Sequence, residues 1–270
     1  MSDTHRHPAG KPALVTTFHD PRGRLRWVID TLAARTDPLG LSGLEQVYQS
    51  RIAVVTAATD TVARGMLSEN GFSLLVHENE SRYASNWLAL ETGLETDATR
   101  FHHCDLDRYF HWLLNWPDEL LCATKRMSHT GLIMFRRTAR AFSTHPASQQ
   151  LTEGPANRVA ARVFGIPDTD LFSGSFGFGR DAAQALVRNG ARSDASFFVE
   201  AIKVAFRSRM PIDSLAVEGL EWETPDQYRN EIDRLGYEKW LDRFQSPGEW
   251  EFRSQMAANW IEQCCSVGPV

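Results

Sequence analysis

The sequence predicts an α/β fold, with a mainly parallel central sheet flanked by helices and a C-terminal helical extension. Short apolar, β-prone runs alternate with amphipathic helical segments through the first half of the chain. This pattern implies right-handed crossovers between parallel strands. From Pro225 onward the sequence turns charged and helical. We therefore expect one domain over residues 1–270, with its core at 12–225 and the helical extension at 226–270.

In the first half, predicted strands and helices follow one another in strict alternation. The strands are ALVTTF (13–18), RIAVVTAAT (51–59), FSLLVHEN (72–79) and RFHHCDLD (100–107). The helices between them are LRWVIDTLAAR (25–35), TVARGMLSEN (61–70) and SRYASNWLALETGLE (81–95). The first helix spaces its apolar residues at helical period. The loop before the second, Thr59-Asp60-Thr61, supplies natural N-caps, and Gly71 terminates that helix.

The second half is less regular, but strand and helix signals continue. We predict a strand and bend in TGLIMFRRTARAF (130–142) and a helix in QQLTEGPANRVAARVFG (149–165). LFSGSFGFGRDAAQALVRNG (171–190) predicts a short strand, a glycine-rich turn and a helix opened by Asp181. An amphipathic helix, DASFFVEAIKVAFRSR (194–209), and a strand around PIDSLAVEGLEW (211–222) complete the core.

Composition excludes several classes of protein. The 270 residues are 42% hydrophobic, which suffices for one sizeable core. With 29 basic and 34 acidic residues, no global field draws the chain to nucleic acid or an anionic membrane. Four cysteines show neither metal-finger nor disulfide-framework spacing, and no apolar run is long enough for a signal peptide core or a membrane span. We expect a cytoplasmic protein without nucleic-acid partners or a membrane span. The sequence is compatible with a homo-oligomer and sets no oligomeric state.

The segment "FHHCDLDRYFHW" contains the candidate metal-binding residues. On a strand, Asp105 and Asp107 would point to the same side, at the carboxyl edge of the sheet where α/β proteins bind ligands. Magnesium and manganese take oxygen ligands and need only one or two carboxylates when substrate phosphates supply the rest. A cation held there would stabilise charge on a departing diphosphate. The alternative is structural, with either aspartate capping a short helix "RYFHWLL".

Two neighbouring patterns resemble known sites but predict none. His102, His103 and Cys104 are consecutive strand residues, so their side chains alternate between faces and cannot converge on one tetrahedral zinc. "GSFGFGRD" lacks both the dinucleotide order Gly-x-Gly-x-x-Gly and the Gly-Lys-Ser/Thr of a P-loop. Its glycines are equally consistent with a tight turn.

The order of "ALVTTF", "RIAVVTAATD", "RYASNWLALE", "HHCDLDR" and "SGSFGFGRDAA" resembles the family-2-like nucleotide-sugar glycosyltransferases of the GT-A fold, over residues 12 to 215. The resemblance implies a donor nucleotide held by Thr16, Thr17, His19, Asp60, Arg82 and Asn86. It implies a diphosphate bound through Mn²⁺ or Mg²⁺ on Asp105 and Asp107, with Asp105 also counted among the donor-binding residues. It implies an acceptor loop at Ser173, Gly174, Gly177, Gly179 and Arg180. In inverting members the base would correspond to Asp194, with Glu200 in reserve.

The sequence also departs from that family. The second strand ends in "TAATD" where the family commonly has acidic residues, so the nucleotide is left open. No histidine follows His145, so a third metal ligand would be Glu218, Glu221 or Glu223, or be missing. Inversion and retention both stay open.

The leading prediction is a metal-dependent glycosyltransferase that moves a sugar from a nucleoside-diphosphate donor to an unidentified acceptor. One alternative is a non-catalytic binding or assembly protein of the same fold, whose charged C-terminal helices form the partner surface. Another is a nucleotidyltransferase on a related fold, which would bind a nucleoside triphosphate. The absence of an early glycine-rich, Arg/Lys-bearing signature after the first strand argues against the latter.

Overall fold

A computed structural model describes residues 10–36, 40–78, 82–192 and 196–267. In these residues, seven strands form one sheet in the order β3-β2-β1-β4-β6-β5-β7. The strands are β1 (Ala13–Phe18), β2 (Ser50–Thr56), β3 (Ser73–His77), β4 (Arg100–Cys104), β5 (Leu132–Arg137), β6 (Ser175–Gly179) and β7 (Ile212–Val217). All pairings are parallel except those of β6, which runs antiparallel to both β4 and β5. The predicted mainly parallel sheet is confirmed.

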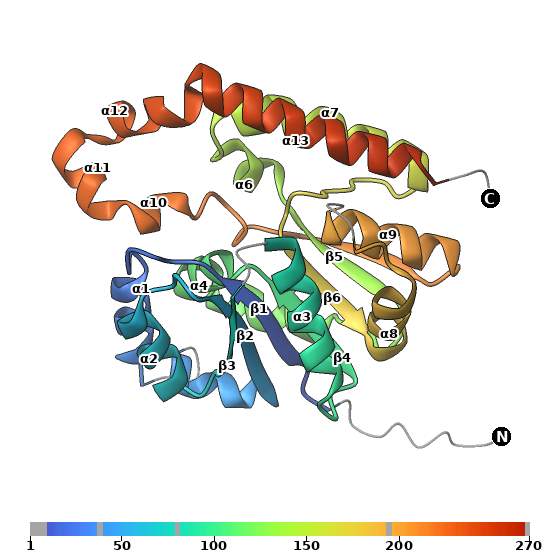
Figure 1. The fold of residues 1–270 in the computed structure, drawn as a ribbon, viewed down its shortest axis with the longest axis horizontal. Helices are drawn as coiled ribbons and strands as arrows, with labels where there is room; N and C mark the ends of the chain where they lie inside the picture. The colour runs from blue at the N-terminus through green and yellow to red at the C-terminus, as the bar shows by residue number, and fades with distance from the viewer. Residues whose placement is uncertain (1–9, 37–39, 79–81, 193–195, 268–270) are drawn as a thin grey trace.

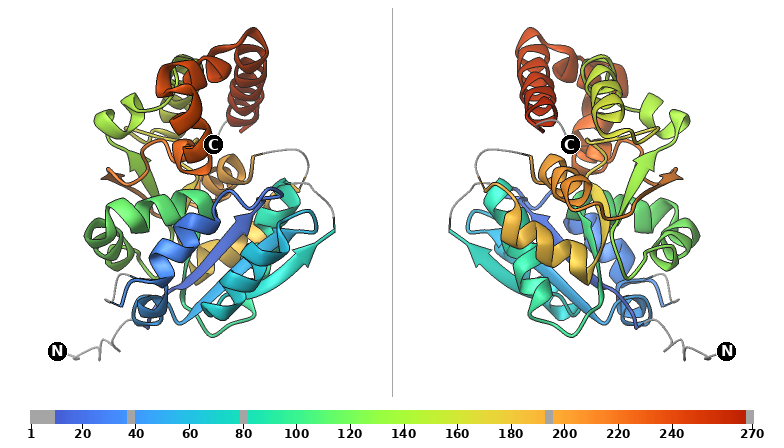
Figure 2. Two further views of the ribbon diagram at one scale, coloured as in Figure 1. Left: turned by 90° about the vertical axis from the view of Figure 1, so that its left-hand side faces the viewer. Right: turned by 90° about the vertical axis from the view of Figure 1, so that its right-hand side faces the viewer.

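Helices cover both faces of the sheet (Figures 1 and 2). One face packs against α1 (Arg26–Ala33), the 3-10 helix η1 (Leu41–Gln46), α2 (Thr61–Glu69), α4 (Leu106–Asn115) and α5 (Pro117–Lys125). The other packs against α3 (Arg82–Leu94), α7 (Ala147–Phe164), α8 (Arg180–Asn189), α9 (Phe197–Arg207) and α13 (Pro247–Cys265). Strand alternation produces the two cores, since Ala13 and Val15 of β1 lie in one and Leu14 in the other.

The glycine-rich segment is a strand rather than the predicted turn. β6 pairs with β4 from Cys104↔Ser175 to Arg100↔Gly179, so its first residue lies beside the last residue of β4. Glycine permits close packing in this strand, because a Cβ on Gly179 would stand 2.2 Å from the carbonyl oxygen of His129. The helix after it begins at Arg180, with Asp181 in its first turn.

The predicted C-terminal helical extension is confirmed. After α6 (Ala139–Ser143) and α7, the chain completes the sheet and then forms α10 (Thr224–Gln227), α11 (Arg229–Leu235), α12 (Tyr237–Leu241), the 3-10 helix η2 (Asp242–Gln245) and α13. Helix α13 lies along α7 above one end of the sheet (Figure 1). Trp222 and Trp240, with ring centroids 5.3 Å apart, pack the extension against the core. None of the described helices is long and apolar enough to cross a membrane. The assignment to a single domain stays a prediction.

Candidate functional site

The carboxyl ends of β1, β2 and β4 border a cavity of about 280 Å³, here the first cavity. Its walls combine apolar strand residues with polar side chains. They are Thr17, Phe18, His19, Leu25, Val54, Thr56, Ser85, Asp105, Asp107 and Gln227. The cavity therefore occupies the place where an α/β sheet is expected to bind ligands.

Asp105 and Asp107 both line the first cavity, but they are not strand residues. β4 ends at Cys104, Asp105 occupies the N-cap position of α4, and Asp107 lies in the first turn of that helix. The predicted strand over 100–107 is therefore too long, and the helix-start alternative is correct for the secondary structure. The Asp105 side chain does not cap the helix. Both carboxylates lie at the positive end of the helix dipole, which stabilises negative charge.

The first cavity also has a polar edge on β1 and β2. Nδ1 of His19 and Oγ1 of Thr56 share a 2.8 Å hydrogen bond, and Thr56 in turn bonds Thr59 at 3.0 Å. Thr17 lies beside them on the cavity wall. Of the predicted donor-binding residues, Thr17, His19 and Asp105 thus come together in the first cavity.

A contact from the extension closes this cavity, and sequence reasoning missed it. The Gln227 side chain of α10 donates a 3.0 Å hydrogen bond to Oδ2 of Asp107. Next to Gln227, Asp226 accepts a 2.7 Å bond from His111 of α4. No local sequence signal links position 227 to position 107.

Asp105 also lines a second cavity, of about 100 Å³, between α9, α13 and the segment before β6. The rings of Phe172 and Trp260 stack with centroids 4.1 Å apart on its wall. Its polar and charged lining residues are Asn86, Asp105, Arg108, Glu153, Ser196 and Arg253. Asn86 is 4% exposed, and its Oδ1 has no hydrogen-bond partner within the described part of the chain. A ligand hydroxyl in this cavity would satisfy that buried acceptor.

Gly174 lines the second cavity and lies directly against Asp105. Its backbone has φ of +69°, and a Cβ there would stand 2.9 Å from Oδ2 of Asp105 and 2.7 Å from Nη1 of Arg108. Its carbonyl accepts a 3.2 Å hydrogen bond from the Asp105 amide. Only glycine combines this left-handed conformation with so close an approach.

Arg108 supplies the positive charge at this point. Burial alone would lower the pKa of its guanidinium, but Glu223, Asp105 and Asp107 together raise that pKa above its usual value. Its Nη1 donates a 2.6 Å hydrogen bond to the Phe172 carbonyl, and Nε lies 3.6 Å from Glu223 Oε1. Arg108 therefore stays charged and fixes the segment that carries Gly174.

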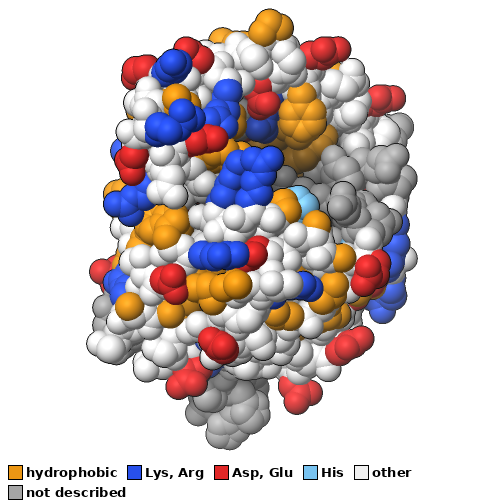
Figure 3. All heavy atoms as spheres, turned by 60° about the vertical axis from the view of Figure 1, so that its left-hand side comes forward, with side chains coloured by type: hydrophobic (Ala, Val, Ile, Leu, Met, Phe, Trp, Pro, Cys, Tyr) orange, Lys and Arg blue, Asp and Glu red, His pale blue; other side chains and the backbone are white. Residues whose placement is uncertain are grey.

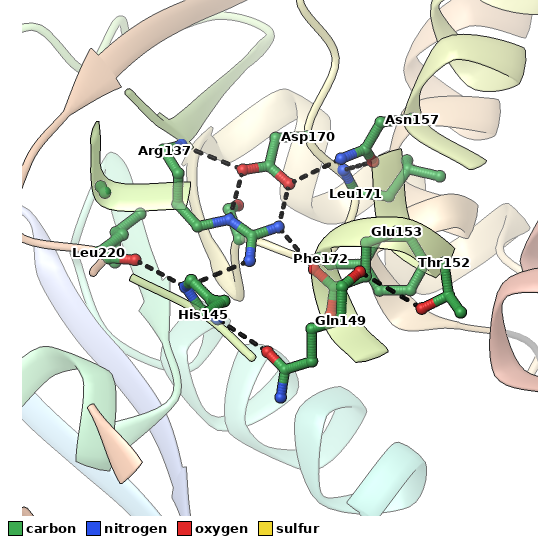
Figure 4. A network of polar contacts seen from close by, with 12 residues as sticks. Arg137, His145, Gln149, Thr152, Glu153, Asn157, Asp170, Leu171, Phe172 and Leu220 are labelled. Carbon is green, nitrogen blue, oxygen red and sulfur yellow. Dashed lines mark hydrogen bonds and ion pairs between the residues drawn. The ribbon is translucent and has the colours of Figure 1, made fainter. Parts of the chain in front are cut away.

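Glu153 belongs to a buried ionic network (Figure 4). Nη2 of Arg137 donates to Glu153 Oε2 at 2.8 Å and to Asp170 Oδ1 at 2.7 Å. Burial raises the pKa of the Glu153 carboxyl, although Arg137 opposes the effect. This network joins β5, α7 and the segment before β6, and a single sequence gives no sign of such a long-range pairing.

The remaining predicted donor-binding residues lie elsewhere. Thr16 is fully buried and donates a 2.5 Å hydrogen bond to the Cys104 carbonyl, which ties β1 to β4. Asp60 caps α2 by accepting from the Ala63 amide at 2.8 Å, as predicted, and it pairs with Arg26 at 2.5 Å. Asn86 lies in the second cavity rather than the first. The Arg82 side chain lies outside the described residues.

The predicted acceptor and base residues are also dispersed. Because β6 is antiparallel to β4 and begins opposite Cys104, Gly174 lies beside Asp105, and the residues after Ser175 run away from it. Gly177 is inside β6. Arg180 donates to the carbonyls of Leu94, Thr96 and Ala98, near the amino end of β4 and so at the opposite end of that strand from Asp105. The proposed base Asp194 lies outside the described residues.

The reserve base Glu200 lies in the first turn of α9, and its role stays a prediction. It is 2% exposed, ion-paired with Lys203, and accepts a 3.1 Å hydrogen bond from the Ala191 amide. It lines neither the first nor the second cavity.

The described residues hold no cluster of three or more His, Cys, Asp or Glu side chains arranged to bind a metal ion. The proposed third ligands are engaged elsewhere, since Glu218 and Glu221 pair with Arg140, and Glu223 faces Arg108. Two carboxylates on one cavity still fit Mg²⁺ or Mn²⁺, which commonly complete their coordination with waters and substrate phosphates.

No protein-family model matches the sequence, and no curated protein matches it. Among solved structures, the chain is similar to one assigned as a nucleotide-diphospho-sugar transferase from Desulfovibrio desulfuricans, with 11% identity and a TM-score of 0.45 over 94% of this chain and 97% of that one. A mannosyltransferase from Pyrobaculum calidifontis, in complex with GDP-Man and Mn²⁺, has 11% identity and a TM-score of 0.46 over 99% and 79%. A mycobacterial protein has 15% identity and a TM-score of 0.44 over 77% and 66%.

Proposed function

We propose that the protein is a metal-dependent glycosyltransferase that moves a sugar from a nucleoside-diphosphate donor to an acceptor hydroxyl. One observation carries the proposal: Asp105 lines two adjoining cavities, the first shared with Asp107 and the second with Asn86 and Glu153. A donor has two parts that match this division. The nucleoside diphosphate would lie in the first cavity, and the transferred sugar would lie in the second.

The side chains of each cavity suit the part assigned to it. Phe18, Leu25 and Val54 offer an apolar surface for a nucleobase, and His19 and Thr17 offer polar groups for a ribose. In the second cavity, the Asn86 carbonyl oxygen would accept from a sugar hydroxyl, and the Phe172 and Trp260 rings would border the sugar ring.

In the reaction, the bond between the anomeric carbon and the diphosphate oxygen breaks, and the acceptor oxygen forms the new bond. Asp105 and Asp107 would hold Mg²⁺ or Mn²⁺, which as a Lewis acid supplies charge stabilisation for the departing diphosphate. Arg108 keeps positive charge beside the two carboxylates.

An inverting transfer also needs a group that accepts the proton of the acceptor hydroxyl. Asp194 stays a prediction for that role. Among the described carboxylates, Glu153 lines the second cavity together with Asp105. Burial raises the pKa of the Glu153 carboxyl toward neutral pH, and a general base works best when its pKa lies near the working pH. We propose Glu153 as a second candidate base.

The proposal can be tested by calorimetric titration of UDP and GDP, and of their sugar conjugates, with and without Mn²⁺. At least one nucleotide should bind in a Mn²⁺-dependent manner, and Asp107→Ala should abolish that dependence. Asp118→Ala is the matched control, because Asp118 is an exposed first-turn residue of the neighbouring helix α5. Equal affinity with and without Mn²⁺ would refute the metal assignment. Donor binding without hydrolysis or transfer would instead favour a binding protein.

A further inference from the structure

A third cavity, of about 430 Å³, lies between the chain before and within α1 and the helices α10 and α11. Four arginines line it, and we call it the arginine cleft: Arg22, Arg24, Arg26 and Arg229. Figure 3 shows this side of the molecule, where Lys and Arg side chains gather beside a hollow. The cleft has no part in the transfer proposed above.

Aromatic residues hold two of these arginines in place. The Arg24 guanidinium lies 3.9 Å from the ring centroid of Tyr228, and that of Arg229 lies 5.0 Å from the ring of Trp27. Trp27 also donates a 2.7 Å hydrogen bond to the Asp226 carbonyl, which fixes the two walls relative to each other. A guanidinium stacked on a ring keeps its N–H groups in its own plane, where they can donate to an anion.

The charges of the cleft are not balanced within it. Arg26 is paired with Asp60, whereas in the described part of the chain Arg22, Arg24 and Arg229 form no ion pair. The acids that line the cleft are mostly engaged: Asp226 with His111 and Glu231 with Arg243, leaving Asp30. Three guanidinium groups facing one carboxylate favour a ligand that carries more than one negative charge.

The cleft adjoins the first cavity. Gln227 lines both, and its amide donates to Asp107. An anion bound in the cleft would therefore lie next to the α10 residues that close the first cavity.

We propose that the arginine cleft binds a phosphate monoester. Such a group carries between one and a half and two negative charges at neutral pH and presents oxygens to several donors at once, which matches Arg22, Arg24 and Arg229. The same chemistry occurs on soluble phosphorylated metabolites and on lipid headgroups such as phosphatidic acid. This proposal does not depend on glycosyl transfer.

The test is a titration of inorganic phosphate into the full chain in the presence of EDTA, which removes binding through a divalent cation in the first cavity. The double variant Arg24→Gln/Arg229→Gln should bind about a hundredfold more weakly, since each of the two lost charge-assisted hydrogen bonds costs roughly tenfold. The control with the same change of charge is Arg158→Gln/Arg162→Gln, at two exposed arginines on α7. Arg22→Gln, at an exposed position, provides a second variant should the double variant fail to fold.

Cosedimentation with phosphatidic acid vesicles, compared with phosphatidylcholine vesicles, identifies the source of the phosphate. Binding of inorganic phosphate supports a soluble ester, and binding to phosphatidic acid vesicles alone supports a lipid headgroup. Failure of both assays, or equal binding by wild type and variants, overturns the proposal. Mn²⁺-dependent nucleotide binding measured on the same variants reports separately on the first cavity.

Discussion

Gly174 and Asp105 lie so close together that a single methyl group on Gly174 would stand 2.9 Å from Oδ2 of the aspartate. The two residues come from different strand ends, brought side by side by the antiparallel pairing of β6 with β4. The position of the Asp105 carboxylate therefore depends on the absence of a side chain at position 174.

Gly174→Ala should weaken Mn²⁺-dependent nucleotide binding by about tenfold or more, because the new Cβ displaces Asp105 or Arg108. It should also lower the free energy of unfolding by roughly 1–2 kcal/mol, because alanine is strained at φ +69°. Calorimetry and urea unfolding measure the two effects. Gly248→Ala is the control, since nothing lies within 4 Å of its added Cβ. Wild-type nucleotide affinity in Gly174→Ala would contradict the arrangement proposed for Asp105.

His111 should make stability depend on pH. Burial lowers its pKa, but the hydrogen bonds that its ring donates to Asp226 and Glu221 outweigh burial and raise the pKa to about 9. Because the pKa in the folded state exceeds the ordinary histidine value of 6.5, the stabilisation is fully present below pH 6.5 and is lost as pH rises through 9. The loss should be on the order of 2–3 kcal/mol. Urea unfolding at pH 6 and pH 9.5 measures it, and His111→Gln should flatten the difference. A wild-type difference retained in this variant would assign it to other groups.

Glu153→Gln tests the second candidate base. If Glu153 accepts the acceptor proton, or that of water in slow donor hydrolysis, turnover should fall about a hundredfold while nucleotide affinity is unchanged. The fall in turnover on the acidic side of the pH profile, which reports protonation of the base, should also be lost. Asp170→Asn disturbs the same Arg137 network without touching either of the first two cavities. An equal loss of turnover in both variants would indicate a structural role only.

Glu200→Gln should lower the stability of the protein without abolishing turnover. The change leaves the buried Lys203 charge without its partner, which costs about 3–5 kcal/mol. Adding Lys203→Met should restore much of this loss, and nucleotide affinity should remain that of the wild type. Thermal unfolding and calorimetry provide the measurements. Normal stability with abolished turnover would support the catalytic role that the sequence predicted.

Local patterns were sufficient for the first half of the fold. The runs that became β1 to β3, and the Asp60 cap of α2, were correct because period and capping depend on neighbouring residues. Asp105 and Asp107 both line the first cavity, but they lie at the start of α4 rather than on a strand, and their role as metal ligands stays a prediction. Asp105 and Asp107 are compatible both with a strand end and with a helix cap, so local patterns left open where the strand ends and α4 begins.

The remaining features, β6 and the second cavity, depend on contacts between residues far apart in the sequence. The glycine-rich segment has the composition of a turn, and it is a strand because His129 and β4 pack closely against its bare backbone. The second cavity combines Asn86 of α3 with Arg253 and Trp260 of α13. Contacts of this kind depend on how the C-terminal extension packs on the core, and the hydrophobic periodicity of the sequence does not predict that packing.

The wall that α13 contributes to the second cavity has a kinetic consequence. Contacts between segments so far apart along the chain close slowly, because a large loop entropy opposes them. Because α13 follows the last strand in the chain and packs on helices rather than pairing with a strand, we expect the sheet and α1 to α4 to be in place before α13 docks. A renaturing sample should therefore regain its affinity for nucleotide ahead of its capacity for turnover.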